Sequence, residues 1–230
     1  AAYNLFLQNA DICLSDSGLL ALEEAGEDAF FDEKFVYRLF LDGRFDRLGR
    51  YHYPWWQKIP SEIRPHILID GEQTAEHDFN SPQVHCLYGM KGLAFTEGDP
   101  YILPGFEDRR EDVKAVFTRS VNVNSEERFV RSCRKKGIED GPSLGNTFYD
   151  FHSAIFDFKF MEMGKELMFM ESEVATLVME RCMIDDVIVL GVHDSFIAQE
   201  HVDLPSLMIW ACAEKGWISI PEIKTILPYN

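Results

Sequence analysis

Two aspartates, Asp78 and Asp194, have the sequence context of carboxylates that bind a metal ion. Asp78 ends the segment TAEHDF, and Asp194 follows the apolar run VIVLGV in GVHDSF. A carboxylate at a strand end is costly to bury unpaired, and two of them on neighbouring strands repel each other unless a cation lies between them. Mg²⁺ takes one or two carboxylates together with substrate phosphates, and two such ions assist phosphoryl transfer. The alternative is that each aspartate is a solvated turn residue.

Two cations in the segment DRREDVKAVF have the spacing of a phosphate-binding pair. Arg110 and Lys114 are four residues apart, so on a helix they share a face opposite the apolar Val113, Val116 and Phe117. Such a pair could bind a triphosphate. The alternative is a solvated cationic face that pairs with nearby carboxylates.

Three histidines, His77, His85 and His193, lie near the two aspartates in the sequence. A zinc or nuclease site built from His and Asp is one interpretation. Ordinary hydrogen-bonded histidines of the core or of turns are the other. The sequence contains no GxSxG, Walker, GxGxxG or HExxH motif, so it gives no support to nucleophilic or dinucleotide chemistry.

The elements that must position these residues follow from hydrophobic patterning. HILID and TAEHDF flank GEQ, which predicts a hairpin, and DVIVLGVHDSFIAQE predicts a second hairpin with His193 and Asp194 near its tip. Helices are expected over residues 15–31, 32–43, 81–92, 108–121, 124–137, 171–183 and 202–216. Strand pairs that alternate with helices predict an α+β fold, with an antiparallel sheet and helices on one face.

Composition limits the possible partners. The 230 residues suffice for one core, and no apolar run is long enough to span a membrane. Thirty-nine acidic residues against 22 Lys and Arg give a net charge of −17, so nucleic acid would have to be bound by a local surface. The candidate cations fall in residues 44–50, 109–114 and 128–136. Five scattered cysteines without a CxxC pattern are expected to be reduced thiols in a cytoplasmic protein.

Four segments, taken in order, resemble the motifs of one enzyme family. GRYHYPWWQKIP resembles the GR…PNLQNIP element of the family A DNA polymerases and the related single-subunit RNA polymerases of phages and mitochondria. EHDFNSPQVHCLYG resembles their motif A, RREDVKAVF resembles the R-x-x-x-K helix of motif B, and VIVLGVHDSFI resembles motif C. The chain is also similar to compact polymerase-like proteins of bacterial mobile elements.

The resemblance implies a polymerase palm, with a small antiparallel sheet backed by helices, and a reduced helical fingers subdomain. The expected division is an N-terminal helical segment (1–48), a first palm part (49–104), the fingers (105–165) and a second palm part (166–230). We expect at least one of Trp55 and Trp56 to pack beneath the palm. The implied activity is template-directed addition of nucleotides to a DNA or RNA strand with Mg²⁺ or Mn²⁺. The implied partners are nucleoside triphosphates and a primer–template.

The resemblance also assigns roles to individual residues. Asp78 and Asp194 are the expected catalytic metal ligands. The expected nucleotide-binding residues are Arg110, Lys114, Gln83, Thr118 and Asn122. The residues expected to face nucleic acid are Arg50, Gln57 and His193, with His193 near the primer end.

The chain departs from the family pattern at the positions that sense the sugar. Asn122 and Val123 stand where motif B has Tyr-Gly, and Gln83 replaces the glutamate that DNA polymerases have after the motif A aspartate. No thumb is evident, so either the rest of the protein is absent from this chain, or a further chain or partner holds the nucleic acid, or the activity is distributive or lost. A metal-dependent nuclease or phosphohydrolase is one alternative function. A degenerate polymerase fold kept as a binding or regulatory module is the other.

Overall fold

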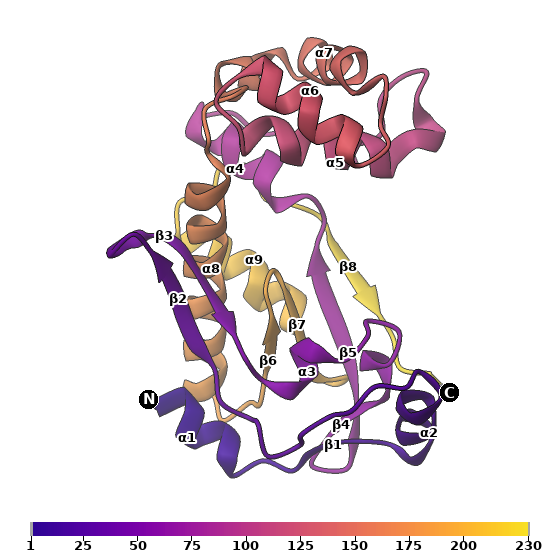
Figure 1. Cartoon of the computed structure of the whole chain (residues 1–230). Helices are drawn as coiled ribbons and strands as arrows, with labels where there is room; N and C mark the ends of the chain where they lie inside the picture. Colours follow the sequence, from indigo (N-terminus) through magenta and orange to yellow (C-terminus); the bar gives the residue numbers. More distant parts are fainter. Residues whose placement is uncertain (1, 230) are drawn as a thin grey trace. The chain divides into compact units, whose positions relative to one another are not determined.

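An antiparallel sheet organises the part of the chain that carries Asp78 and Asp194 (Figure 1). The structure, a computed structural model, describes residues 2–229. The strand order is β1-β4-β5-β7-β6, and β8 also pairs with β5. The strands are β1 (Ile12–Leu14), β4 (Ile67–Ile69), β5 (Glu72–Phe79), β6 (Leu190–Val192), β7 (Ser195–Gln199) and β8 (Ile223–Ile226). The expected α+β class with a small antiparallel sheet is confirmed.

The chain divides into two compact units. The sheet unit contains the residues up to Asn80, Glu171–Gly216 and the residues from Glu222 onward, and the helical unit contains Ser81–Met170 and Trp217–Pro221. The boundaries therefore differ from the expected ones after residues 48, 104 and 165. Residues 1–48 are not a separate helical segment, because their strand β1 joins the main sheet beside β4.

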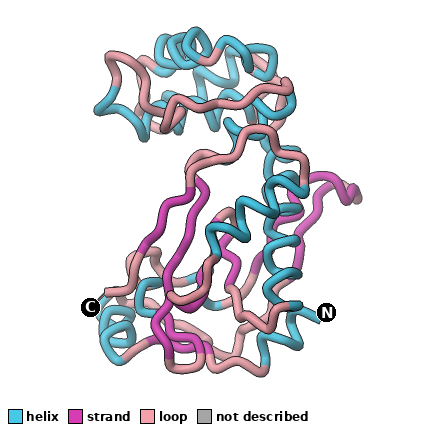
Figure 2. The backbone as a smooth tube through the Cα atoms, turned by 180° about the vertical axis from the view of Figure 1, so that it is seen from behind, coloured by secondary structure: helices cyan, strands magenta, loops and turns pink. Residues whose placement is uncertain are grey.

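Helices and buried tryptophans support the sheet within the sheet unit. The helices there are α1 (Ala2–Gln8), α2 (Asp16–Glu24), α3 (Trp55–Lys58), α9 (Leu204–Glu214) and the C-terminal part of α8 (Gly164–Ile184). Helices α8 and α9 lie over one face of the strands, and the view from behind shows both in front (Figure 2). Trp55 and Trp56 are both fully buried, as expected. The Trp56 indole N–H donates to the carbonyl of Gly191 on β6 at 3.2 Å.

Both expected hairpins are present. Asp70 and Gly71 join β4 to β5 with φ angles of 52° and 79°, the left-handed values that a two-residue hairpin turn uses. His193 and Asp194 join β6 to β7, and His193 has a φ of 60°. Asp194 therefore sits in the tip of the second hairpin, where the sequence predicted it.

The expectation of a helix over residues 32–43 is wrong. This segment contains β2 (Tyr37–Leu41), which forms a two-stranded antiparallel ribbon with β3 (Arg44–His52). Asp42 and Gly43 connect the strands with φ angles of 57° and 68°. An Asp-Gly pair between β-favouring residues is a strong hairpin signal, and here it outweighs the helical spacing of the apolar residues.

Three helices of the helical unit coincide with expected ones, namely α4 (Pro82–Met90), α5 (Arg110–Val121) and α6 (Glu126–Lys135). A fourth helix, α7 (Gly141–Phe151), was not expected from the sequence. Val113, Val116, Phe117 and Val121 are fully buried on one face of α5. The hydroxyl of Ser125 caps α6 by accepting from the N–H of Arg128. Short 3₁₀ helices lie at Glu107–Arg109 and Ser153–Phe158 in this unit and at Arg64–His66 in the sheet unit.

Two buried histidines make the helical unit sensitive to acid. His85 Nδ1 lies 2.8 Å from the Ser219 hydroxyl, and His152 lies between the Tyr88 hydroxyl and the Pro100 carbonyl. Burial lowers the pKa of each histidine to about 4 from 6.5. The unfolded chain binds these protons first as the pH falls, so the stabilisation is complete above pH 6.5 and is lost as the pH falls to about 4.

We therefore expect the free energy of unfolding of this unit to fall between pH 6.5 and pH 4, by on the order of 3 kcal/mol for each histidine. Urea titrations followed by circular dichroism at several pH values measure the loss. His152→Gln removes one of the two titrating groups and should flatten the pH dependence. An unchanged slope in that variant would contradict the prediction.

The five cysteines are reduced thiols outside any disulfide, and four of them are buried. The cytoplasmic location inferred from them stays a prediction. Across residues 2–229, the structure contains no helix with both the length and the apolar character needed to cross a membrane.

Candidate active site

The strand register places Asp78 and Asp194 at neighbouring positions of the sheet. Asp78 on β5 lies opposite Ser195 on β7, and the N–H of Phe79 donates to the Asp194 carbonyl at 3.4 Å. With a strand spacing of about 4.8 Å and a rise of about 3.4 Å per residue, the two aspartate Cα atoms are about 6 Å apart. Both aspartates are half-buried. The fold thus brings the two carboxylate residues together from distant parts of the sequence.

A further carboxylate, Glu76, lies on the same face of β5 as Asp78, because side chains alternate along a strand. Glu76 is 5% exposed. It accepts from Arg64 Nε at 2.8 Å, from Arg64 Nη2 at 3.2 Å and from the Ser195 hydroxyl at 2.6 Å. These donors satisfy the buried charge, so Glu76 and Arg64 form a fixed ion pair next to Asp78.

Lys224 approaches Asp78 from the other edge of β5. The register of β8 places Lys224 directly opposite Asp78. Opposite charges at directly facing positions of two strands attract each other. Asp78 is therefore flanked by Ser195 on one neighbouring strand and by Lys224 on the other.

Arg50 on β3 supplies a fixed positive charge near Asp194. Its Nη2 donates to Glu171 Oε2 on α8, and the two side chains are 19% and 3% exposed. Burial disfavours the charged guanidinium, but the carboxylates of Glu171 and Asp194 outweigh it and raise the pKa of Arg50. Its Nε is buried without a hydrogen-bond partner among residues 2–229. Arg50 is thus a fixed cation beside Asp194 that still has a donor available.

His193, which precedes Asp194, is half-buried at the hairpin tip. Its ring lies 5.4 Å from the ring of His52 on β3. Burial and then the positive charge of Arg50 lower the pKa of His193, with Asp194 opposing them. Its Nδ1 is buried and has no hydrogen-bond partner within the described part of the chain. The lowered pKa favours the neutral imidazole of His193 next to the carboxylate pair.

The carboxylates of Asp78 and Asp194 are a suitable donor set for Mg²⁺. This ion is held by one or two carboxylates where water and substrate phosphates complete its coordination. A structural or catalytic zinc ion instead needs three or four protein ligands. No group of three or more His, Cys, Asp or Glu side chains within residues 2–229 is arranged to hold a metal ion. Two carboxylates are a ligand number that suits Mg²⁺ rather than zinc.

Two of the three histidines considered for a His–Asp nuclease site lie elsewhere. His77 follows the alternation of β5 onto the face opposite to Asp78, and its Nδ1 lies 3.0 Å from the Thr225 hydroxyl. His85 belongs to the helical unit, where it pairs with Ser219. Both are hydrogen-bonded histidines of the ordinary kind, so this alternative loses two of its expected ligands.

Of the two residues on α5 expected to bind phosphate, Arg110 forms an ion pair and Lys114 is exposed to solvent. Arg110 Nε donates to Asp99 Oδ2 at 2.7 Å, and its guanidinium lies 5.6 Å from the centre of the Tyr101 ring. Lys114 is exposed, and no ion pair of this side chain is found within residues 2–229. Phosphate binding by the two residues stays a prediction.

The other residues expected to bind the nucleotide also belong to the helical unit. Thr118, one turn beyond Lys114, is exposed, and its hydroxyl donates to the Lys114 carbonyl. Asn122 Nδ2 donates to the Thr118 carbonyl at 2.7 Å. Gln83 is half-buried in the first turn of α4. Lys114, Thr118 and Asn122 follow one another at four-residue spacing, so they form one polar stripe along α5.

Gln57, expected to face nucleic acid, holds the corner between β3 and α3. Its Nε2 donates to the carbonyls of Gly191 at 2.8 Å and Tyr51 at 3.2 Å. Gly191 also accepts from Trp56. The Gln57 amide is therefore a positioning group in this structure, and its contact with nucleic acid stays a prediction.

The sequence analysis did not predict three charged residues of the site, namely Glu76, Lys224 and Arg64. Glu76 has a signal, because it is two residues before Asp78 and so shares its face of a strand. Lys224 lies on β8, which the sequence analysis left without an element. Arg64 has no local signal, since only the folded sheet brings it to Glu76.

No protein-family model matches the chain, and no curated protein matches it in sequence. Among solved structures, the chain is similar to the POL domain of Pol1 from M. smegmatis in complex with DNA primer-template and dNTP. The TM-score is 0.43 at 12% sequence identity, and the match covers 91% of this chain and 49% of that chain. This chain thus spans about half the length of that structure. A likeness at this TM-score assigns no function, which has to be inferred from the residues of the site.

Proposed function

We propose that this chain is a nucleotidyltransferase of the polymerase type, which extends the 3′-hydroxyl of a primer and releases pyrophosphate. The observation that carries the proposal is the adjacency of Asp78 and Asp194 on neighbouring antiparallel strands. The four motif-like segments, in the family's order, support it. Mg²⁺ or Mn²⁺, nucleoside triphosphates and a primer–template are the cofactor and partners that belong to the proposal.

In this reaction the bond from O3′ to the α-phosphorus forms, the bond to pyrophosphate breaks, and the 3′-hydroxyl gives its proton to water. Asp78 and Asp194 would hold Mg²⁺, which would supply positive charge against the negative charge that develops on the transferred group. Arg50, held by Glu171 beside Asp194, adds a fixed positive charge that needs no reorganisation during the reaction.

A primer-extension assay with Mg²⁺, run separately with deoxy- and ribonucleotides, tests the proposal. Stepwise lengthening of a labelled primer supports it and identifies the preferred sugar. Shortening of the primer in the absence of nucleotides would favour the nuclease alternative. Binding of primer–template with neither reaction would favour the module without activity.

We expect Lys114→Ala to raise the KM for the nucleotide about tenfold or more, because a charge-assisted contact to phosphate contributes about 1.5–3 kcal/mol. Lys114 is exposed, so the variant should fold normally. Steady-state primer extension at varied nucleotide concentration measures the effect. Lys136→Ala, which removes an exposed lysine at the end of α6, is the matched control. A KM equal to that of the control would contradict the role of Lys114.

A further inference from the structure

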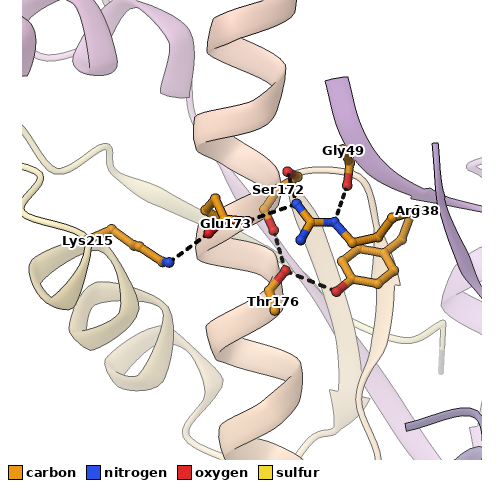
Figure 3. Close-up of polar contacts among 7 residues, drawn as sticks. Arg38, Gly49, Ser172, Glu173, Thr176 and Lys215 are labelled. Carbon is orange, nitrogen blue, oxygen red and sulfur yellow. Dashed lines mark hydrogen bonds and ion pairs between the residues drawn. The ribbon is translucent and has the colours of Figure 1, made fainter. Parts of the chain in front are cut away.

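The β2–β3 ribbon has one face that is fixed to the rest of the sheet unit. Arg38 on β2 donates to the carbonyl of Gly49 and to the side chains of Ser172 and Glu173 on α8, at 2.8–2.9 Å (Figure 3). Tyr51, which lies opposite Arg38 in the ribbon, also bonds to α8. The ribbon is therefore a rigid support for whatever its other face carries.

That other face carries a row of aromatic rings. Tyr37 and His52 lie opposite each other, so both side chains leave the ribbon on the face opposite to that of Arg38 and Tyr51. The row consists of Phe35, Tyr53, Tyr37, His52 and His193, and we call it the ring row. Its successive ring centroids are 4.2, 6.0, 6.5 and 5.4 Å apart.

The ring row is accessible to solvent rather than part of the core. Phe35 and Tyr37 are 41% and 48% exposed, and Leu39, two residues further along the same strand, is 47% exposed. Tyr53, His52 and His193 are half-buried. Exposed apolar side chains that lie next to one another form a candidate binding surface.

Tyr53 is held in an unusual backbone conformation within the row. Its φ of 106° lies in the region that residues with side chains seldom adopt. Its hydroxyl donates to Glu33 Oε1 at 2.9 Å, and the Lys58 ammonium lies 4.1 Å from its ring centre. Phe35 stacks on the same ring at 4.2 Å, so Tyr53 supports the row from within it.

The ring row ends at the candidate active site. His193 is its last ring, and Asp194 is the next residue in the chain. Arg50, whose pKa is raised in part by Asp194 and whose charge lowers the pKa of His193, lies two residues before His52 on β3. A ligand on the row that reaches His193 would therefore also reach the carboxylate pair.

We propose that the ring row binds the unpaired nucleotides of a nucleic-acid strand, whose bases stack on its rings as the strand approaches Asp194. This inference rests on the proposed function and names the partner of that same site. Every base has an aromatic face, so stacking on such rings tolerates any sequence. The nearby cations Lys58 and Arg50 already pair with Glu33 and Glu171. Stacking rather than phosphate binding must therefore supply most of the affinity, as suits so acidic a protein.

The test is the fluorescence anisotropy of a labelled oligodeoxythymidylate titrated with the full chain, in parallel with primer extension. We expect Tyr37→Ala to weaken binding about tenfold, the loss of one stacked base, and Tyr37→Trp to restore it. Affinity should change little with salt, because few phosphate counterions are released. Phe156→Ala, which removes a 53% exposed ring of the helical unit, is the matched control and should bind as the wild type does.

The outcomes distinguish failure of the ring-row proposal from failure of the proposed activity. If Tyr37→Ala binds the oligonucleotide as Phe156→Ala does, the ring row is not the binding site, whether or not the wild type extends a primer. If binding depends on Tyr37 but the wild type extends no primer, the ring row stands and the proposed function fails. Binding of duplex but not of single strands, or of an apolar peptide instead, would overturn the inference.

Discussion

Asp194→Asn is expected to abolish primer extension, with a loss of at least about a thousandfold in kcat. Asp194 neighbours Asp78 across β5 and β7, and the amide keeps the shape of the side chain but removes the charge that would hold a metal ion. Metal ions contribute several kcal/mol of transition-state stabilisation, and each 1.36 kcal/mol is a factor of ten in rate. Single-turnover extension with saturating nucleotide measures the chemical step directly.

The same variant separates a catalytic role from a structural one. Asp194→Asn relieves the repulsion between the two carboxylates but also weakens the attraction between Asp194 and Arg50, so the urea midpoint of the variant should stay close to that of the wild type. Asp28→Asn, an exposed aspartate of the sheet unit, is the control for the substitution itself. If Asp194→Asn extends primers as fast as Asp28→Asn does, the carboxylate pair is not the catalytic centre. A degenerate fold that only binds nucleic acid would show that result.

The sequence predicted the position of the carboxylate pair because local signals and the global fold agree there. The Asp70–Gly71 turn and the apolar residues on either side fix the first hairpin, and the apolar run before His193 fixes the second. A strand that ends in Asp78 and a turn that contains Asp194 then meet once these hairpins pair. The resemblance to the polymerase motifs rests on these same residues.

Other parts of the site depend on contacts that no local pattern reveals. Residues 32–43 have apolar residues at a spacing that also fits a helix, and only the left-handed Asp42–Gly43 turn makes them a ribbon. A prediction of a helix for this segment therefore does not place the rings of the ring row next to one another. Strand β8 is short and is defined by its pairing with β5. The position of Lys224 opposite Asp78 therefore could not be predicted from the sequence.

The buried ion pair between Arg64 and Glu76 joins two residues that no local sequence pattern connects, and we expect it to stabilise the sheet unit. Glu76 is 5% exposed, and its Oε2 accepts from Arg64 Nε at 2.8 Å. We expect Arg64→Met to lower the free energy of unfolding of the sheet unit by about 3–5 kcal/mol, because it leaves a buried carboxylate without its cation. Urea unfolding followed by tryptophan fluorescence measures this, since Trp55, Trp56 and Trp210 belong to the sheet unit.

A second substitution distinguishes the unpaired charge from lost packing as the cause. Arg64→Met combined with Glu76→Leu removes both charges, and it should recover much of the stability that Arg64→Met loses. Arg44→Met is the control, because Arg44 pairs with Asp46 where both side chains are more than half exposed, and no measurable change is expected. If Arg64→Met costs no more than Arg44→Met, the pair does not stabilise the sheet beneath Asp78. If the double variant is as unstable as Arg64→Met, the lost free energy of unfolding comes from packing around the guanidinium. The unpaired, buried charge of Glu76 is then not its cause.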